Sequence, residues 1–204
     1  MVRRGFKTQA EEIALEIRAE LKLAPQARLI PTDLAEHLGI PVLSLQGLAP
    51  FEAEGEEEDV SFGDAVALFT GPSREKLSAF TVAQDTHRLI VYNESHPETR
   101  QANSLAHELS HILLEHEPSP HSDQYGHRFW SPEIEEEANL LAAALLVPRE
   151  GARIVLESGR SEAQAAKHFG VSLQLFQWRA RQTGVLRQLA NATVSSEPAT
   201  NEPD

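Results

Sequence analysis

Residues 106–116 read AHELSHILLEH, and residues 131–148 read SPEIEEEANLLAAALLVP. In the first stretch, His107 and His111 are four residues apart and Glu108 directly follows the first histidine. Residues four apart lie on one face of an α-helix, so both imidazoles can reach a single cation. Glu108 would lie beside that cation, where its carboxylate can take a proton from a metal-bound water molecule. This pattern indicates a hydrolytic metal site.

The His-Glu-x-x-His pattern is suggestive on its own but does not decide the function. With the 9 histidines and 25 glutamates of this chain, about 0.05 such matches are expected by chance. A catalytic zinc ion also needs a third protein ligand and an open position for water. The extended metzincin pattern would require a glycine at position 114 and a histidine at position 117. The chain has Leu114 and Glu117 there, which excludes that arrangement.

The second stretch offers a third ligand. The chain has no cysteine, so a metal must be held by His, Asp or Glu. Glu135 and Asn139 are four apart and share a helix face, so Glu135 could bind the metal while Asn139 supports a histidine ring. Glu136 and Glu137 point roughly 100° and 200° around the helix from Glu135. We interpret these two as acids stabilised by the helix dipole, an interpretation that also remains open for Glu135.

The remaining pattern predicts an α+β fold. Apolar spacing predicts helices over residues 9–23, about 99–116 and 132–147, the last with Ser131 as N-cap and Pro132 in its first turn. Short runs rich in β-branched and aromatic residues predict strands, which together fit a small antiparallel sheet. These runs are DAVALF (64–69), LSAFTV (77–82) and RLIVYN (88–93), and PVLSLQ (41–46) is a possible further strand. We expect a zincin-like peptidase domain with helices packed on this sheet.

The charged residues are distributed unevenly along the chain. Of the net charge of −13, residues 1–150 contribute 12 Lys/Arg against 26 Asp/Glu, whereas residues 151–190 contribute 6 against 2. This change suggests a peptidase domain over 1–150, a helical segment over 151–190 and a disordered acidic tail over 191–204. The amino terminus has no apolar signal-peptide core, and no apolar run is long enough to span a bilayer. We therefore expect a cytoplasmic protein.

The basic segment at 161–184 resembles a helix-turn-helix. Ser161 and Gln164 fit a capping box, Gly170 would end the first helix and Ser172 would cap the second. Arg179 and Arg181 on the second helix could face DNA phosphates. The alternative, which we favour because the body is acidic, is a helical pair that packs on the peptidase domain or docks its partner.

Residues 88–116, RLIVYNESHPETRQANSLAHELSHILLEH, followed by EEEANLLAAALLVP at 135–148, resemble the ImmA/IrrE family of metallopeptidases. The resemblance implies a gluzincin-like site, with His107, His111 and Glu135 as metal ligands and Glu108 as general base. It leaves Zn²⁺ and Mn²⁺ open as the cofactor. It also implies a substrate, namely a Cro/repressor-type helix-turn-helix repressor that is cleaved to release transcription in DNA-damage responses or mobile-element regulation. Family members often carry a helix-turn-helix after the peptidase domain.

Several assignments remain open. Leu89, Ile90, Val91 and Tyr92 could bind an extended substrate if their strand lies at the sheet edge, although an interior strand is equally compatible with the sequence. A side chain that helps stabilise the oxyanion could be Tyr125, His121 or His127. His116, nine residues after His107, should point away from the metal face, so we expect it either at the surface or in contact with a ligand without binding the metal.

Two other functions compete with a repressor-cleaving endopeptidase. One is a DNA-binding regulator that acts through residues 161–184 and carries a structural or vestigial metal site. The other is an aminopeptidase for small peptides, which would need no particular protein substrate.

Overall fold

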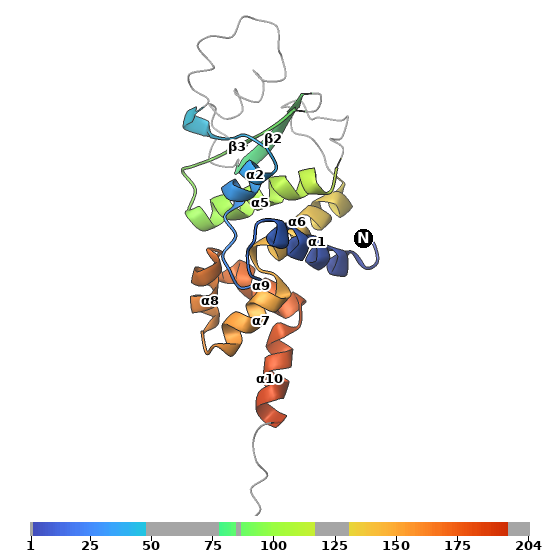
Figure 1. Ribbon diagram of the computed structural model, residues 1–204, viewed down its shortest axis with the longest axis vertical. Helices are drawn as coiled ribbons and strands as arrows, with labels where there is room; N and C mark the ends of the chain where they lie inside the picture. Colours follow the sequence, from blue (N-terminus) through green and yellow to red (C-terminus); the bar gives the residue numbers. More distant parts are fainter. Residues whose placement is uncertain (1, 48–77, 85–86, 117–130, 196–204) are drawn as a thin grey trace, which may run out of the picture.

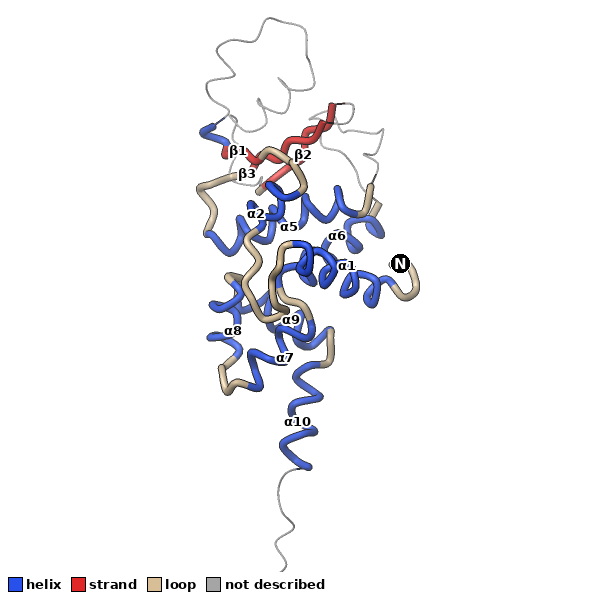
Figure 2. The backbone as a smooth tube through the Cα atoms, viewed as in Figure 1, coloured by secondary structure: helices blue, strands red, loops and turns tan. Residues whose placement is uncertain are grey.

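A computed structural model describes residues 2–47, 78–84, 87–116 and 131–195 of the chain. Strands gather at one end of the molecule, and helices are stacked beneath them in successive layers (Figures 1 and 2). The elements are α1 (Phe6–Glu20), α2 (Pro31–His37), β1 (Val42–Ser44), β2 (Ala79–Gln84), β3 (His87–Tyr92), α5 (Glu98–Leu113), α6 (Pro132–Leu146), α7 (Arg149–Glu157), α8 (Glu162–Phe169), α9 (Leu173–Gln182) and α10 (Val185–Ser195).

Helix α6 is the centre of the core. Every side chain from 140 to 147 is at most 3% exposed, so this segment is buried on all sides. Its main neighbours are α5 and α1, which pack against it from different directions. The three alanines at 142–144 keep the helix slim, and small side chains allow neighbouring helices to approach closely. The predicted start of α6 is confirmed: the Ser131 hydroxyl accepts a hydrogen bond from the Ile134 amide, and Pro132 occupies the first turn.

Two buried arginines bind the carbonyl end of α6. The Arg18 guanidinium of α1 donates to the carbonyls of Leu145 (2.9 Å) and Leu146 (3.4 Å). Arg179 of α9 donates through Nε to the Val147 carbonyl at 3.1 Å. The last carbonyls of a helix have no partner within the helix and carry the negative end of its dipole, so cations are favourable there. Burial lowers the pKa of Arg18 to about 10, which still leaves it protonated at neutral pH.

The sheet is mixed rather than antiparallel as predicted. Its strand order is β1-β3-β2; β2 pairs antiparallel with β3, whereas β1 pairs parallel with β3. The parallel pair arises because the chain crosses from β1 to the distant β3 instead of turning back in a hairpin. Ile90 points into the main helical core, and Val91 packs into a separate small cluster with Leu45. The strand predicted at 64–69 lies outside the described residues.

The central position of β3 corrects one site prediction. Residues Ile90 to Tyr92 pair with β1 on one side and with β2 on the other, so their backbone groups are already hydrogen-bonded. Residues 90–92 therefore do not form the open edge to which a substrate strand could add, and Leu89 pairs with Val82 of β2. Among the described strands, β1 and β2 hold the two edges.

The predicted helix signals after residue 160 are confirmed. The Ser161–Gln164 capping box is formed, Gly170 adopts a left-handed conformation (φ 70°) at the end of α8, and the Ser172 hydroxyl accepts from the Leu175 amide at the start of α9. However, Phe169, Phe176 and Ala180 belong to the same apolar cluster as the helices before residue 150. The packing therefore continues across the predicted boundary at residues 150/151, and the assignment of a separate helix-turn-helix stays a prediction.

The structure contradicts the prediction that Arg179 binds DNA. Its side chain is 2% exposed, and besides Val147 it binds Glu11 of α1 at 2.5 Å and Gln182 at 2.7 Å. Arg181, two residues later, points about 200° away around the helix and is exposed. Spacing in the sequence did not reveal which of the two arginines faces the core.

The disordered tail was predicted to begin at residue 191, which is too early. Helix α10 continues to Ser195, so residues 191–195 are helical. No glycine or proline interrupts residues 185–195, and Val185 at the start of the helix is fully buried.

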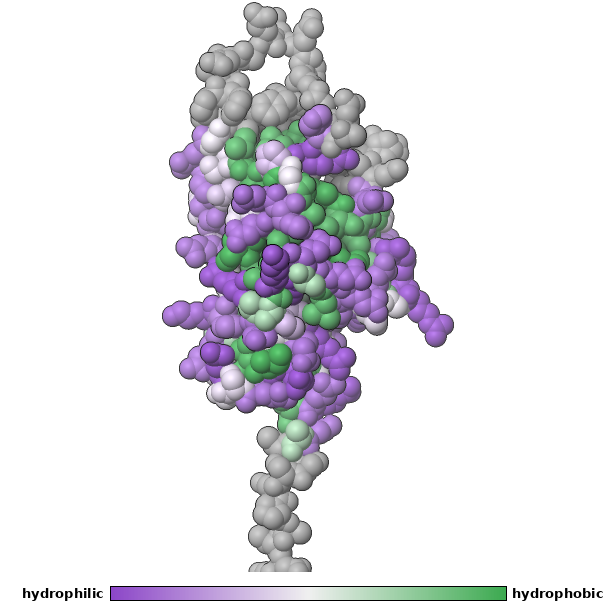
Figure 3. Space-filling view, viewed as in Figure 1, coloured by the Kyte–Doolittle hydropathy of each residue, from purple (hydrophilic) through white to green (hydrophobic). Residues whose placement is uncertain are grey.

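The face of the molecule in Figure 3 is largely hydrophilic, with apolar side chains between the charged ones. None of the helices in the described ranges has the length and apolarity required to cross a membrane.

We predict that Arg179→Ala lowers the free energy of unfolding by about 3 kcal/mol, because it leaves Glu11 without its buried cation and the Val147 carbonyl without its donor. Arg181→Ala, the matched control at an exposed position, should change it by less than about 0.5 kcal/mol. Urea denaturation of both variants measures the difference. If the two variants have the same free energy of unfolding, the buried contacts of Arg179 do not stabilise the fold.

Candidate metal centre

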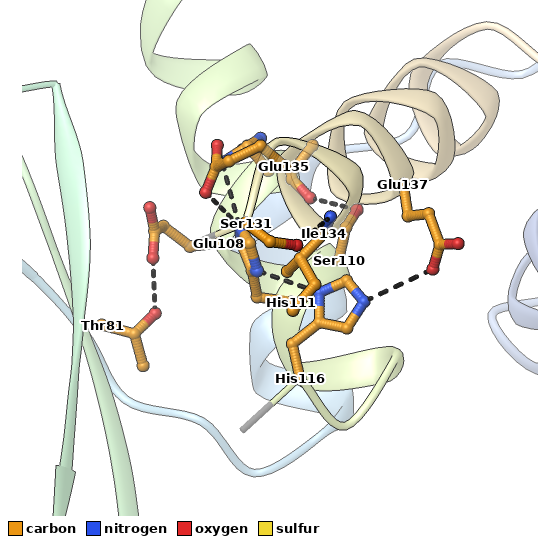
Figure 4. Close-up of polar contacts among 11 residues, drawn as sticks. Thr81, Glu108, Ser110, His111, His116, Ser131, Ile134, Glu135 and Glu137 are labelled. Carbon is orange, nitrogen blue, oxygen red and sulfur yellow. Dashed lines mark hydrogen bonds and ion pairs between the residues drawn. The ribbon is translucent and has the colours of Figure 1, made fainter. Parts of the chain in front are cut away.

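The metal pattern lies on the second half of α5 and faces the first turn of α6 (Figure 4). The Nε2 atoms of His107 and His111 are 3.1 Å apart. Glu135 approaches both rings, with one carboxylate oxygen 3.4 Å from His107 Nε2 and the other 3.4 Å from His111 Nε2. The helical spacing aligns the two histidines, and the packing of α6 on α5 brings the carboxylate to them. The structure therefore brings all three predicted ligands together.

The geometry of these three atoms fits a divalent cation. Among the described residues, only His107, His111 and Glu135 form such a cluster, and their ligand atoms all lie within 4.8 Å of one another. Ligand bonds of about 2.0–2.1 Å at a tetrahedral angle place the donor atoms roughly 3.3–3.4 Å apart, close to the distances found. Two imidazoles and one carboxylate leave a fourth position open, as in catalytic zinc sites.

The electrostatics of the cluster show strong coupling between the groups. Hydrogen bonds from His107 and then His111 lower the pKa of Glu135 to about 2, although burial opposes this shift. Burial of the His107 ring disfavours its protonation, but the hydrogen bond to Glu135 and the charges of Glu108 and Glu135 outweigh that effect and raise its pKa. A carboxylate held ionised between two imidazoles is the charge state that a metal ligand requires.

Glu108 points from α5 toward the sheet rather than into the ligand cluster (Figure 4). One of its carboxylate oxygens accepts a hydrogen bond of 2.7 Å from the hydroxyl of Thr81 on β2. This contact holds the carboxylate on the side of α5 that faces the sheet, and the role of Glu108 as general base stays a prediction. Thr81 was not predicted, because nothing in its local sequence distinguishes it from other strand threonines.

The acids of α6 have different environments. Glu136 is exposed, as expected for a residue turned away from the cluster. Glu137 is instead buried and binds Arg3, so the helix dipole is not its only stabilising partner. Asn139 shares the face of α6 that carries Glu135 and is among the groups that raise the pKa of His107; its role in supporting the ring stays a prediction. Glu137 was missed because its partner Arg3 lies 134 residues away in the sequence.

Three residues proposed as oxyanion helpers lie outside the described residues, namely His121, Tyr125 and His127.

We predict that Glu135→Gln weakens Zn²⁺ binding at least about tenfold, because the amide lacks the negative charge that a metal ligand supplies. Glu136→Gln, on the next residue of the same helix, is the matched control and should bind Zn²⁺ like the parent. Competition with a chromophoric chelator measures both dissociation constants. Equal weakening in the two variants would exclude a specific ligand role for Glu135.

Comparison with known families agrees with this site. The model of the IrrE N-terminal-like domain, peptidase M78, matches residues 35–181. The match runs from α2 into α9 and so includes both the histidine pair of α5 and the acids of α6. Neither the curated proteins nor the solved structures give a significant match to the chain. Because the matched residues make up most of the sequence, the chain belongs to the peptidase M78 family, the metallopeptidases of the IrrE/ImmA type, whose chemistry implies a divalent metal ion.

Proposed function

We propose that this protein is a metal-dependent endopeptidase in which His107, His111 and Glu135 hold Zn²⁺ or Mn²⁺ and Glu108 is the general base. The observation that carries the proposal is the convergence of the three ligand atoms within 4.8 Å of one another. Nitrogen and carboxylate ligands suit zinc and also admit manganese. The family membership supports the peptidase chemistry.

A bound divalent cation would supply Lewis-acid chemistry, by making a water molecule more acidic and polarising the peptide carbonyl. The protein's own part begins with Glu108, which takes the proton from the attacking water and passes it to the leaving amine. The Thr81 hydroxyl donates to one Glu108 oxygen and so leaves the other carboxylate oxygen available for this proton. Glu135 approaches the His107 ring from the side of α6, where we propose that Asn139 also supports it.

Strand β2 is the candidate surface for an extended substrate. In the described part of the sheet, β2 pairs only with β3, and its Thr81 is in contact with Glu108. A peptide that adds to a strand edge is held by backbone hydrogen bonds and by pockets for alternate side chains. A segment paired along β2 would therefore pass beside the general base, the position that hydrolysis requires.

The proposed substrate is a Cro/repressor-type helix-turn-helix repressor, whose cleavage would relieve transcriptional repression in a stress response or in a mobile element. Support for it comes from the resemblance of residues 88–116 and 135–148 to the ImmA/IrrE family. The competing function, DNA binding through residues 161–184, loses support because Arg179 is occupied in the core.

We predict that Glu108→Gln reduces cleavage by about 10²- to 10⁴-fold while Zn²⁺ binding stays within about threefold, since the residue transfers a proton and does not hold the metal. The assay mixes the protein with the Cro-type repressor encoded nearest to its gene, with Zn²⁺ or Mn²⁺, and resolves the products on a gel. A single cut by the parent protein only is the expected result. Equal cleavage by parent and variant would rule out Glu108 as the base, and turnover of short peptides alone would favour an aminopeptidase.

We predict that Thr81→Val lowers kcat about tenfold, because it removes a hydrogen bond to a charged group that restrains Glu108. Thr81→Ser keeps the hydroxyl and should restore most of the rate. The same gel assay, run at saturating repressor, measures kcat for both variants. If Thr81→Ser is as slow as Thr81→Val, retaining the hydroxyl does not preserve the rate, and the hydrogen bond to Glu108 is not the cause of the loss.

A further inference from the structure

The end of α5 has an unusual backbone for its sequence. Leu114 is the C-cap, and the next residue, Glu115, adopts a left-handed conformation with φ 52°. The Glu115 amide donates to the Ile112 carbonyl and the His116 amide donates to the His111 carbonyl, each at 3.0 Å. These two bonds form a Schellman motif, which usually has glycine at the left-handed position. A glutamate there is less favourable than glycine, so the turn is maintained by other contacts.

The motif places His116 directly against a predicted metal ligand. In a continuing helix, a residue five positions after His111 would lie roughly 140° away around the axis. The reversal at Glu115 instead returns the chain over the last turn, where the side chains of these two motif positions commonly touch. The Nδ1 atoms of His116 and His111 are 3.0 Å apart, with ring centroids 5.1 Å apart and the planes at 68°. His116 therefore supports the far side of the His111 ring (Figure 4).

A buried carboxylate lies on the other side of His116. The Nε2 atom of His116 is 3.8 Å from a Glu137 oxygen, and both side chains are at most 8% exposed. Arg3 binds Glu137 with two hydrogen bonds of 2.7 Å, one from Nε and one from Nη2. The hydrogen bond from Arg3 lowers the pKa of Glu137, so this carboxylate is ionised at neutral pH. The contacts run in the order Arg3, Glu137, His116, His111.

The order of these contacts determines where the ring protons lie. The Nε2 atom of His111 faces His107 and Glu135, so a ligating His111 has its lone pair on Nε2 and its proton on Nδ1. That Nδ1–H can donate to His116 only if His116 Nδ1 is unprotonated. The His116 proton is then on Nε2, where the Glu137 carboxylate faces it.

We propose that His116 is a positioning residue that, together with Glu137 and Arg3, holds His111 in its Nε2-ligating tautomer and so raises the affinity of the site for its metal. The proposal rests on the proposed function, because it takes His111 as a ligand. Metal-ligating histidines usually donate their second N–H to a carboxylate or a carbonyl. Here a second histidine stands between the ligand and the carboxylate.

The first test replaces His116 in the full chain and measures Zn²⁺ affinity by chelator competition. His116→Leu removes the acceptor and should weaken binding about 10- to 100-fold, whereas His116→Asn places an amide oxygen near the Nδ1 position and should recover most of that loss. His37→Leu, at a surface histidine paired with Glu20, is the control and should bind like the parent. Imidazole ¹⁵N NMR of the zinc-loaded parent should show protons on Nδ1 of His111 and on Nε2 of His116.

A second set of tests leaves both histidine rings unchanged and alters residues that hold them in place. Glu115→Gly suits the left-handed backbone and should keep Zn²⁺ affinity, whereas Glu115→Val disfavours that backbone and should weaken binding about tenfold. Arg3→Gln alters a largely exposed side chain, so it should leave the fold intact while weakening binding about threefold to tenfold. If a His116 variant fails to fold, the Zn²⁺ affinity of Arg3→Gln still tests the positioning role of His116.

The outcomes separate this proposal from the metal site itself. If the parent binds no Zn²⁺, or if His111→Leu binds as tightly as the parent, the proposed site fails and this inference with it. If His111→Leu loses binding but both His116→Leu and Arg3→Gln retain it, only the positioning role is overturned. A loss of stability in the metal-free protein with unchanged Zn²⁺ affinity would likewise assign these residues a purely structural role.

Discussion

The packing of α6 against α5 is the contact on which the site depends. The two histidines of α5 can align themselves by helical spacing, but the third ligand lies on another helix, and a metal site tolerates displacements of only a fraction of an ångström. The burial of residues 140–147 fixes α6 in the core, and Glu135 near its start then lies 3.4 Å from the Nε2 atoms of His107 and His111. The apolar half of α6 thus positions its acidic half.

The two ends of α6 are stabilised by opposite charges. Its first turn carries glutamates at the positive end of the helix dipole, and one of these, Glu135, faces the histidines. Its last carbonyls receive the guanidinium groups of Arg18 and Arg179, which come from α1 and α9. Helices from both ends of the chain therefore anchor the helix that carries the ligand. This arrangement explains why α9 packs on the same core as α1 and α6 through Arg179, while Arg181 of the same helix stays exposed.

Glu135 and Glu137 lie two residues apart on α6 but have different partners. The reason is that their side chains leave the helix axis in nearly opposite directions. Glu135 faces the ligand cluster, whereas Glu137 faces Arg3 and His116 on the opposite side of the His111 ring. The histidine is thereby held from two directions, by a carboxylate at Nε2 and by a ring at Nδ1. Both contacts come from short segments next to helix ends, where small changes in backbone geometry redirect a side chain.

Local signals in the sequence determined the helices, their caps and the histidine pair, since helical periodicity and capping act within a few residues. The sequence also identified Glu135 and Asn139, because their spacing on α6 matches a ligand and its support. Only the tertiary structure decided the parallel pairing of β1 with β3, the burial of Arg179 and the contact of Thr81 with Glu108. It alone brought Arg3 to Glu137 and turned His116 onto His111. The physical reason is that these contacts join residues far apart in the chain, or depend on a left-handed glutamate that no propensity predicts.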